Sequence, residues 1–214
     1  MQNKNEYTTD DITVIIIAGG KGERLGGLNK GLLKLNNETF VFHLLKRISP
    51  QSKKQIISAN NDISEYEQYN KTVIKDVNQN SADCQGPLAG IISCKNFIDT
   101  PLVLTIPCDS PMIPTDLTKR LLNTYNQFNT QHPSHISVAH DGKRLQNLFM
   151  LFHSSLLNDM ESYFNDNQRK VYGWIDRHQH YIVDFSDKAD SFINVNDEAN
   201  LDTLISMIKR EQIL

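Results

Sequence analysis

Short runs of apolar, often β-branched residues alternate with amphipathic segments along this chain. Residues 12–18 form a continuous apolar run that ends in glycines, which is typical of a parallel strand buried on both faces. The segment Phe40–Ile48 instead carries apolar residues at helical spacing and stops before Pro50. Further strands are predicted at residues 55–59, 72–76, 102–106, 135–139, 148–152 and 181–185, and further helices at 64–69, 87–97, 115–125, 154–164, 171–177 and about 196–209.

Strands that alternate with helices predict an α/β fold with three layers, in which a mostly parallel sheet has helices on both faces. Residues 1–10 are polar and are expected to form a flexible tail, followed by a single domain at residues 11–214. Ligands of such sheets bind outside the carboxyl ends of the strands. Functional side chains are therefore expected just after the strands that end near residues 18, 59, 76 and 106.

The first predicted strand leads into a loop, residues 18–31, that contains six glycines and the cations Lys21, Arg24 and Lys30. Glycine lets backbone N–H groups approach an anion closely, and cations beside them suit a polyphosphate. The spacing is not that of a Walker loop, and Leu25 stands where the dinucleotide-binding fingerprint requires its third glycine. We interpret the loop as a phosphate-binding loop of another type; the alternative is a long turn with solvated charges.

An aspartate between two prolines follows the strand predicted at residues 102–106. The segment Pro107-Cys108-Asp109-Ser110-Pro111 is expected at the same sheet edge as the glycine-rich loop. Mg²⁺ takes one or two protein carboxylates together with substrate phosphate oxygens, so Asp109 is predicted to bind it. Lys30 and Arg24 are the predicted catalytic cations beside it. The alternative for Asp109 is an Asx turn that starts the next helix.

Composition and charge exclude several functional classes. The formal net charge of −3 lacks the basic surface expected of a nucleic-acid-binding protein. The first eleven residues have no apolar core for a signal peptide, and the apolar run at 14–18 is far too short to span a bilayer. We therefore expect a cytoplasmic protein with neither nucleic acid nor membrane as a partner.

The cysteines and histidines show no metal-binding spacing. The sequence has three cysteines, Cys84, Cys94 and Cys108. Their odd number and the lack of C-x-x-C spacing argue against a disulfide framework and against a structural zinc site. Cys108 is interpreted as a small packed residue. Two histidine pairs are interpreted as surface-loop and helix-end residues, because no Cys or carboxylate completes either set in the sequence: His132 with His135, and His178 with His180.

Several motifs are distributed from about residue 12 to residue 201 of the chain. They are Ile17-Ala18-Gly19-Gly20-x3-Arg24-Leu25-Gly26-Gly27-x2-Lys30-Gly31, Ser58-Ala59-Asn60, Gly86-Pro87-Leu88-Ala89-Gly90, Pro107-Cys108-Asp109-x-Pro111, Asp184-Phe185-Ser186-Asp187 and Phe192-Ile193-Asn194-Val195-Asn196. Taken together, they resemble the molybdenum cofactor guanylyltransferase family. The first and fourth of the main motifs are shared by many nucleotidyltransferases. The Gly-Pro-Leu-Ala-Gly and Asn-x-Asn segments are more specific to this family.

The resemblance implies a Rossmann-like nucleotidyltransferase fold, with GTP as donor and the terminal phosphate of molybdopterin as acceptor. It implies that Asp109 holds Mg²⁺ near the α-phosphate and that Asn194 and Asn196 lie on the acceptor side. It further implies transient contacts with proteins that supply or accept the cofactor. The residues expected to line the nucleotide are Ile17, Ala18, Gly19, Gly20, Lys30, Asn60, Asp76 and Asp109.

Two departures from the family pattern affect the predicted site. The family often has Asn where Ser58 stands, and Asn60 is the candidate to replace that nucleoside contact. The segment Leu145-Gln146-Asn147 stands where a His-Pro pair is expected, which affects the acceptor contacts. Alternatives are a cytidylyltransferase for the same cofactor, a sugar-phosphate nucleotidyltransferase, and a regulator that binds nucleotide without chemistry. Retention of Lys30 and Asp109 argues against the last.

Overall fold

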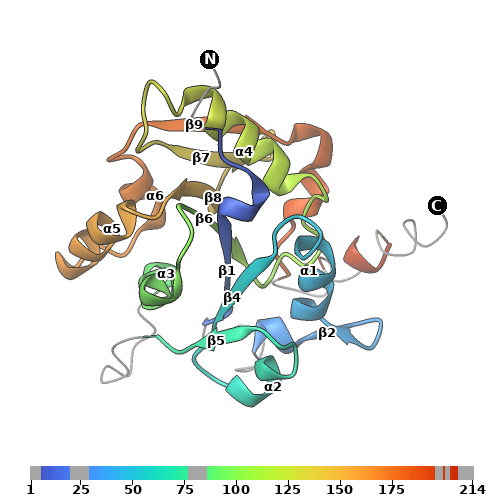
Figure 1. Cartoon of the computed structure of the whole chain (residues 1–214). Coiled ribbons are helices and arrows are strands. Elements are labelled where there is room, and N and C mark those ends of the chain that lie inside the picture. Colours follow the sequence, from blue (N-terminus) through green and yellow to red (C-terminus); the bar gives the residue numbers. More distant parts are fainter. Residues whose placement is uncertain (1–5, 20–28, 77–85, 196–199, 201–202, 207–214) are drawn as a thin grey trace.

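The computed structural model describes residues 6–19, 29–76, 86–195, 200 and 203–206. Within these residues one sheet has seven strands with helices on both of its faces (Figure 1). The strands lie in the order β5 (Thr72–Ile74), β4 (Lys54–Ser58), β1 (Ile12–Ile17), β6 (Leu102–Pro107), β8 (Leu145–His153), β7 (Ile136–His140) and β9 (His180–Asp184). The predicted three-layer α/β architecture is confirmed.

All strands of this sheet except β8 run in the same direction. β5, β4, β1 and β6 pair in parallel, and so do β7 and β9, whereas β8 is antiparallel to both β6 and β7. The sheet is therefore mostly parallel, as predicted. The reversal of β8 was not foreseen, because an apolar run buried on both faces reads the same in either direction. The start of β8 consequently lies at the sheet edge that holds the carboxyl ends of the other strands.

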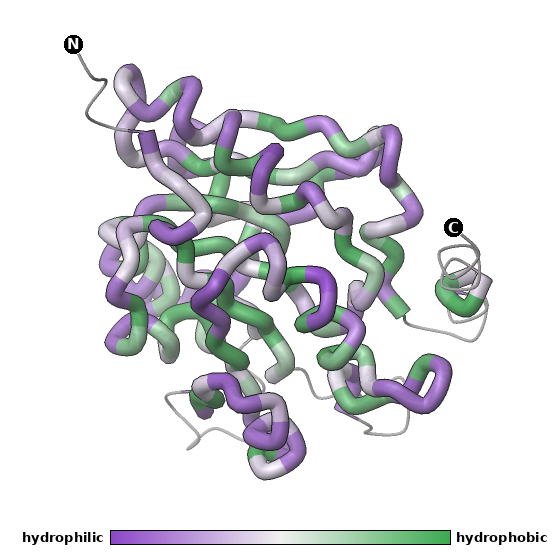
Figure 2. Tube along the Cα trace, turned by 45° about the vertical axis from the view of Figure 1, so that its right-hand side comes forward, coloured by the Kyte–Doolittle hydropathy of each residue, from purple (hydrophilic) through white to green (hydrophobic). Residues whose placement is uncertain are grey.

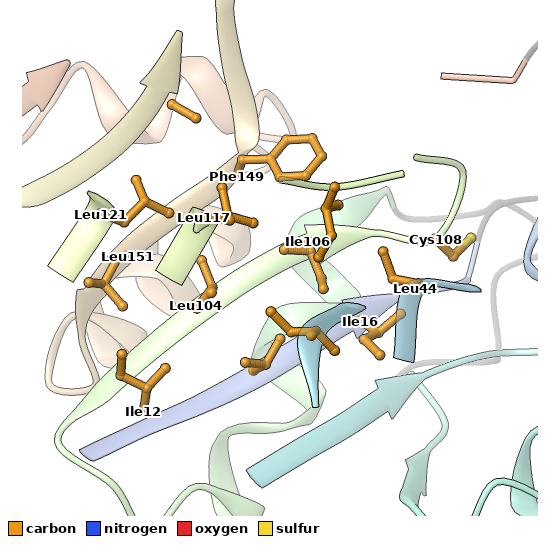
Figure 3. Packing of buried hydrophobic residues seen from close by; sticks show 14 of the residues in the cluster. Ile12, Ile16, Leu44, Leu104, Ile106, Cys108, Leu117, Leu121, Phe149 and Leu151 are labelled. Carbon is orange, nitrogen blue, oxygen red and sulfur yellow. The ribbon is translucent and has the colours of Figure 1, made fainter. Parts of the chain in front are cut away.

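Helices α1 (Phe40–Ile48) and α4 (Leu117–Phe128) cover one face of the sheet, and α3 (Pro87–Ser93), α5 (Leu156–Asn165) and α6 (Val171–Ile175) cover the other. Side chains alternate between faces along a strand, so Ile16 packs in the cluster under α1 and α4 whereas Ile15 packs in the opposite cluster. Figure 3 shows side chains of β1, β6, α1 and α4 meeting in the first cluster. In Figure 2 the hydrophobic stretches concentrate in the interior of the molecule.

Where the structure describes them, the predicted elements agree with it to within a few residues, apart from one divided helix, and several short elements were not predicted. The helix predicted at 87–97 is divided into α3 and the 3₁₀ helix η4 (Lys95–Phe97). Phe97 N donates to Cys94 O (2.9 Å), which is the i→i+3 hydrogen bond of a 3₁₀ helix rather than that of an α-helix. The small hairpin β2 (Lys34–Leu35) and β3 (Glu38–Thr39) was not predicted. Its two-residue turn, Asn36 and Asn37, has positive φ at both positions, a conformation that Asn tolerates.

The N-terminal boundary differs from expectation. Tyr7 N donates to Asn126 Oδ1 (3.0 Å), and Asn126 Nδ2 donates to Tyr7 O (2.8 Å). Two hydrogen bonds to α4 therefore hold part of the segment that was expected to be a free tail, and the short helix η1 (Thr9–Asp11) follows it. Residues 1–5 lie outside the described residues. Of the closing helix predicted to reach residue 209, residues 203–206 are helical.

One remaining helix, α2 (Ile63–Glu67), joins β4 to β5. Two further 3₁₀ helices lie next to predicted site residues: η3 (Lys30–Leu32) and η5 (Ser186–Phe192). No helix in the described parts of the chain is both long and apolar enough to cross a membrane.

Candidate active site

The ends of β1, β4 and β6 are held together beyond the strands themselves. Ala18 N donates to Ser58 O (2.7 Å), and Cys108 N donates to Ile17 O (3.0 Å). Ile17 and Ala18 are buried between the two neighbouring strands. Residue 18, where the predicted phosphate loop begins, is therefore held at the carboxyl edge of the sheet.

Lys30 and Asp109 meet at this edge from opposite sides. Lys30 begins η3, Asp109 follows β6, and Lys30 Nζ lies 3.2 Å from Asp109 Oδ2. The side chains are 22 % and 17 % exposed, so the ion pair is largely enclosed but still reachable by a ligand. The sequence-based expectation that these two residues share one sheet edge is confirmed.

A buried tyrosine fixes the backbone around Lys30. Tyr66 of α2 donates its hydroxyl hydrogen to Asn29 Oδ1 (2.5 Å), and a Cβ placed at Gly31 would collide with that hydroxyl. Burial raises the pKa of Tyr66, so the phenol stays protonated and keeps its donor. The sequence analysis did not identify Tyr66, since its spacing in the sequence marks it only as a core residue of a short helix.

A second cluster joins the ends of β4 and β5. Asp76 accepts from Ser58 Oγ at Oδ1 (3.0 Å) and from Asn60 Nδ2 at Oδ2 (2.7 Å). Asp76 N donates to Asn60 Oδ1 (3.0 Å), and Asn60 Nδ2 also donates to Gly19 O (3.3 Å). A Cβ at Gly90 of α3 would lie 2.5 Å from Ser58 Oγ, so glycine is needed at this close approach. The structure thus brings Gly19, Asn60 and Asp76 together, as the predicted nucleotide site requires.

The predicted acceptor side adjoins the Asp109 turn. Ser110 Oγ donates to Asn194 Oδ1 (2.5 Å), and Val195 N donates to Asp109 O (3.0 Å). Asn194 O accepts from Asn200 Nδ2 (3.1 Å). These contacts hold the Asn194 side chain beside the predicted metal ligand. Ser110 is fully buried and was not identified from the sequence, although its place inside the proline-flanked turn was a usable signal.

Some predicted residues lie outside the described part of the chain. These are the candidate nucleotide contact Gly20, the candidate catalytic Arg24 and the candidate acceptor contact Asn196, together with Cys84. Their roles stay predictions.

The segment that replaces the expected His-Pro pair closes the hairpin between β7 and β8. Gln146 Nε2 donates to Asp141 Oδ2 (2.6 Å), and Asp141 Oδ1 accepts from the backbone N–H groups of Lys143 (2.8 Å) and Arg144 (2.7 Å). Burial works to raise the pKa of Asp141, but these hydrogen bonds stabilise the carboxylate and hold the pKa below its usual value. The oxygen Oδ1 of Asn147 is buried without a hydrogen-bond partner in the structure. Gln146 therefore stabilises the hairpin through its hydrogen bond to Asp141.

One histidine interpretation needs correction. His135 is not on the surface: it is fully buried, with its ring stacked 4.2 Å from that of Tyr125. His178 follows the end of α6, as interpreted, and its Nε2 lies 2.9 Å from Asp159 Oδ2. Cys108 is a buried packed residue, as predicted, and burial raises the pKa of its thiol.

Comparison with known proteins agrees with this geometry. The sequence model of the family described as MobA-like NTP transferase domain matches residues 14–181. A molybdenum cofactor guanylyltransferase of Shewanella halifaxensis is 37 % identical over 188 residues, which cover 88 % of this chain and 90 % of that protein. Another, from Ralstonia nicotianae, is 36 % identical over 198 residues, covering 90 % of this chain and 95 % of the relative.

Solved structures show the same fold at low sequence identity. Molybdopterin-guanine dinucleotide biosynthesis protein A from Archaeoglobus fulgidus superposes with a TM-score of 0.72 at 15 % identity, covering 92 % of this chain and 99 % of that one. A 4-diphosphocytidyl-2C-methyl-D-erythritol synthase from Anaerococcus prevotii superposes with a TM-score of 0.65 at 12 % identity, covering 94 % and 99 %. With the sequence relatives, these findings establish that the chain is a nucleotidyltransferase that belongs to the MobA-like, molybdenum cofactor guanylyltransferase family.

Proposed function

We propose that this protein transfers GMP from GTP to the terminal phosphate of molybdopterin, which releases pyrophosphate and forms the guanine dinucleotide cofactor. The observation that carries the proposal is the contact between Lys30 Nζ and Asp109 Oδ2 (3.2 Å) at the carboxyl edge of the sheet. A cation for phosphate and a carboxylate for metal lie together where nucleotides bind in such folds. The names of the sequence relatives support the same substrates.

We propose Mg²⁺ as the metal, with Asp109 as its protein ligand. Asp109 suits this ion because Mg²⁺ is commonly held by one or two carboxylates and completes its shell with water and substrate phosphate oxygens. The carboxylate remains partly exposed beside the cationic end of Lys30. When bound, Mg²⁺ would neutralise negative charge on the triphosphate.

The residues of the chain then act mainly by alignment and charge stabilisation. The acceptor phosphate has a second pKa of about 6, so it is largely dianionic near neutral pH and needs no strong general base. Asn194, whose side chain is held by Ser110 beside the Asp109 turn, is the residue that we propose to orient the acceptor. Lys30, and by prediction Arg24 and the amides of the glycine-rich loop, stabilise the charge that develops on pyrophosphate.

The choice of guanine rests on the sequence relatives, because the fold is shared with proteins of other names. The test supplies the purified protein with molybdopterin, Mg²⁺ and either GTP or CTP, and measures pyrophosphate release and the dinucleotide product. We expect turnover with GTP and little with CTP. Preference for CTP would favour the cytidylyltransferase alternative, and binding of GTP without pyrophosphate release would favour a regulator.

We further propose that the reaction takes place in the cytoplasm. The support is the cysteine content, since three cysteines without disulfide spacing suit a reducing compartment. Transient contact with proteins that supply molybdopterin or accept the finished cofactor is part of the same proposal.

A further inference from the structure

The side chain of Asn60 joins the ends of three strands. It follows β4, donates from Nδ2 to Gly19 O after β1 (3.3 Å), and donates from the same nitrogen to Asp76 Oδ2 after β5 (2.7 Å). Its Oδ1 accepts from Asp76 N (3.0 Å). The amide therefore links Gly19, at the start of the predicted phosphate loop, to Asp76, whose carboxylate is predicted to contact the nucleoside.

These contacts allow only one orientation of the Asn60 amide. Oδ1 faces a backbone N–H group, which can only donate, while Nδ2 faces a carboxylate and a carbonyl, which can only accept. A flipped amide would place its oxygen against both acceptors and its NH₂ group against the donor. In the observed orientation the two hydrogens of Nδ2 are directed to Asp76 and Gly19, which leaves neither for a nucleotide.

The consequence for Asp76 is a carboxylate held at both oxygens. Ser58 Oγ donates to Oδ1 (3.0 Å) while Asn60 holds Oδ2, so rotation of the carboxylate would break a hydrogen bond at each end. Each carboxylate oxygen can accept more than one hydrogen bond, so both keep capacity for a ligand N–H or O–H group. Hydrogen bonds to a charged group are stronger than neutral ones, which makes this an effective way to fix its direction.

We propose that Asn60 is a positioning residue that acts on the nucleotide through Asp76, by holding its carboxylate in one orientation, rather than by touching the nucleotide itself. This inference rests on the proposed function, in which Asp76 contacts the nucleoside of GTP. It gives Asn60 a different role from the direct contact expected from the sequence.

Three variants test the assignment: Asn60→Ala, Asn60→Asp and, as a matched control, Asn61→Asp. The control adds the same charge one residue further on, at an exposed position. GTP affinity is measured by calorimetry, turnover by pyrophosphate release, and folding by thermal melting. Asn60→Ala should weaken GTP binding about tenfold, the size expected when hydrogen bonds to one charged group are lost, and should change kcat less than KM. The control should bind GTP like the parent.

The pH dependence of Asn60→Asp separates positioning from direct contact. At pH about 8 the introduced carboxylate repels Asp76 and cannot donate, so binding should be as weak as in Asn60→Ala or weaker. Two adjacent carboxyl groups share a proton readily, so by pH about 5.5 the introduced group can donate to Asp76 again. The thiol of Cys94 also interacts with Asp76, but burial raises its pKa to about 12, so it stays protonated throughout this range.

The expected result is that GTP affinity of Asn60→Asp, taken relative to the parent at each pH, recovers on acidification while that of Asn60→Ala does not. Parental affinity in Asn60→Ala would overturn the inference and leave the proposed function standing. If the GTP affinity of Asn60→Asp stayed below that of the parent by the same factor at every pH, the inference would also be overturned. Restoring a hydrogen-bond donor to Asp76 would then have no effect on GTP binding. If the parent itself bound no GTP, the proposed function would fall and this inference with it.

Discussion

Lys30 Nζ and Asp109 Oδ2 lie 3.2 Å apart although 79 residues separate them in the chain. The two side chains reach each other because η3 and the end of β6 meet at the same edge of the sheet. The two side chains keep 22 % and 17 % of their surface exposed, so water can still solvate either charge when its partner is replaced. Either member can therefore be replaced without unfolding the protein, which makes the pair suitable for testing function.

Lys30→Met should weaken GTP binding by about tenfold or more, because it removes a charge that pairs with phosphate while keeping much of the side-chain length. The melting temperature should change little, since water can still reach the Asp109 carboxylate when Lys30 is replaced. Calorimetric titration with GTP checks the first expectation. Lys34→Met, at an exposed position four residues further along, is the matched control, and equal affinity in both variants would remove Lys30 from the site.

Asp109→Asn should abolish most turnover, by about a hundredfold or more, because it removes the charge that a hard cation requires while keeping the size of the side chain. Binding of GTP in the absence of metal should persist or tighten, since a negative charge near the phosphates is gone. Pyrophosphate release is measured across a magnesium titration, with metal-free binding measured separately. Turnover close to the parental rate at every magnesium concentration would mean that Asp109 is not the ligand.

The acceptor side can be tested through Asn194 and its partner. Asn194→Ala should raise KM for molybdopterin several-fold while GTP affinity stays near that of the parent. Ser110→Ala should do the same more weakly, because Ser110 Oγ holds Asn194 Oδ1 (2.5 Å) and is itself buried. Its loss should also cost about 1 kcal/mol of stability, which urea unfolding would measure. Equal losses of stability in both variants with unchanged KM would assign a purely structural role to this contact.

Part of the fold and part of the site could be predicted, because they follow from the pattern of apolar and polar residues along the chain. The bounds of α1, Phe40–Ile48, follow from apolar spacing and from Pro50, before which the helix stops. The meeting of Lys30 and Asp109 follows from the rule that ligands bind at the carboxyl ends of parallel strands. The first feature needs only one segment, and the second needs two segments that each follow a recognisable strand, together with this general rule.

Contacts between distant segments that no such rule covers could not be predicted in this way. Tyr66 supports Asn29 across 37 residues, and Ser110 meets Asn194 across 84. Nothing in the local pattern of either partner indicates the other, since a tyrosine in a short helix and a serine in a turn have many uses. The same holds for His135, which was interpreted from the sequence as a surface-loop residue. Its burial comes from α4 and β9, which pack over it from elsewhere in the chain.

That burial leads to a prediction about stability and pH. The ring of His135 is stacked on Tyr125 (4.2 Å) and meets the edge of Tyr181 (5.1 Å). Its Nδ1 lies 2.5 Å from His132 O, and because a carbonyl can only accept, this nitrogen carries the proton. The other nitrogen, Nε2, is buried and has no hydrogen-bond partner among the residues that the structure describes. Protonation would therefore place an unpaired charge in the core, and burial accordingly lowers the pKa of His135.

The sign of the effect follows from proton binding in the two states. Below its ordinary pKa of about 6.5 the unfolded chain binds a proton at this histidine more readily than the folded chain does, so the free energy of unfolding should fall as the pH drops from about 7.5 to about 5.5. His135→Phe keeps an aromatic ring between Tyr125 and Tyr181 but removes the titrating group, so its urea midpoint should decline less over this range. Burial also lowers the pKa of His153, so this residue should contribute to the same loss of stability on acidification. The variant His153→Gln measures that contribution separately. If the parent and His135→Phe lost stability equally on acidification, the buried ring would not be the source of the pH dependence.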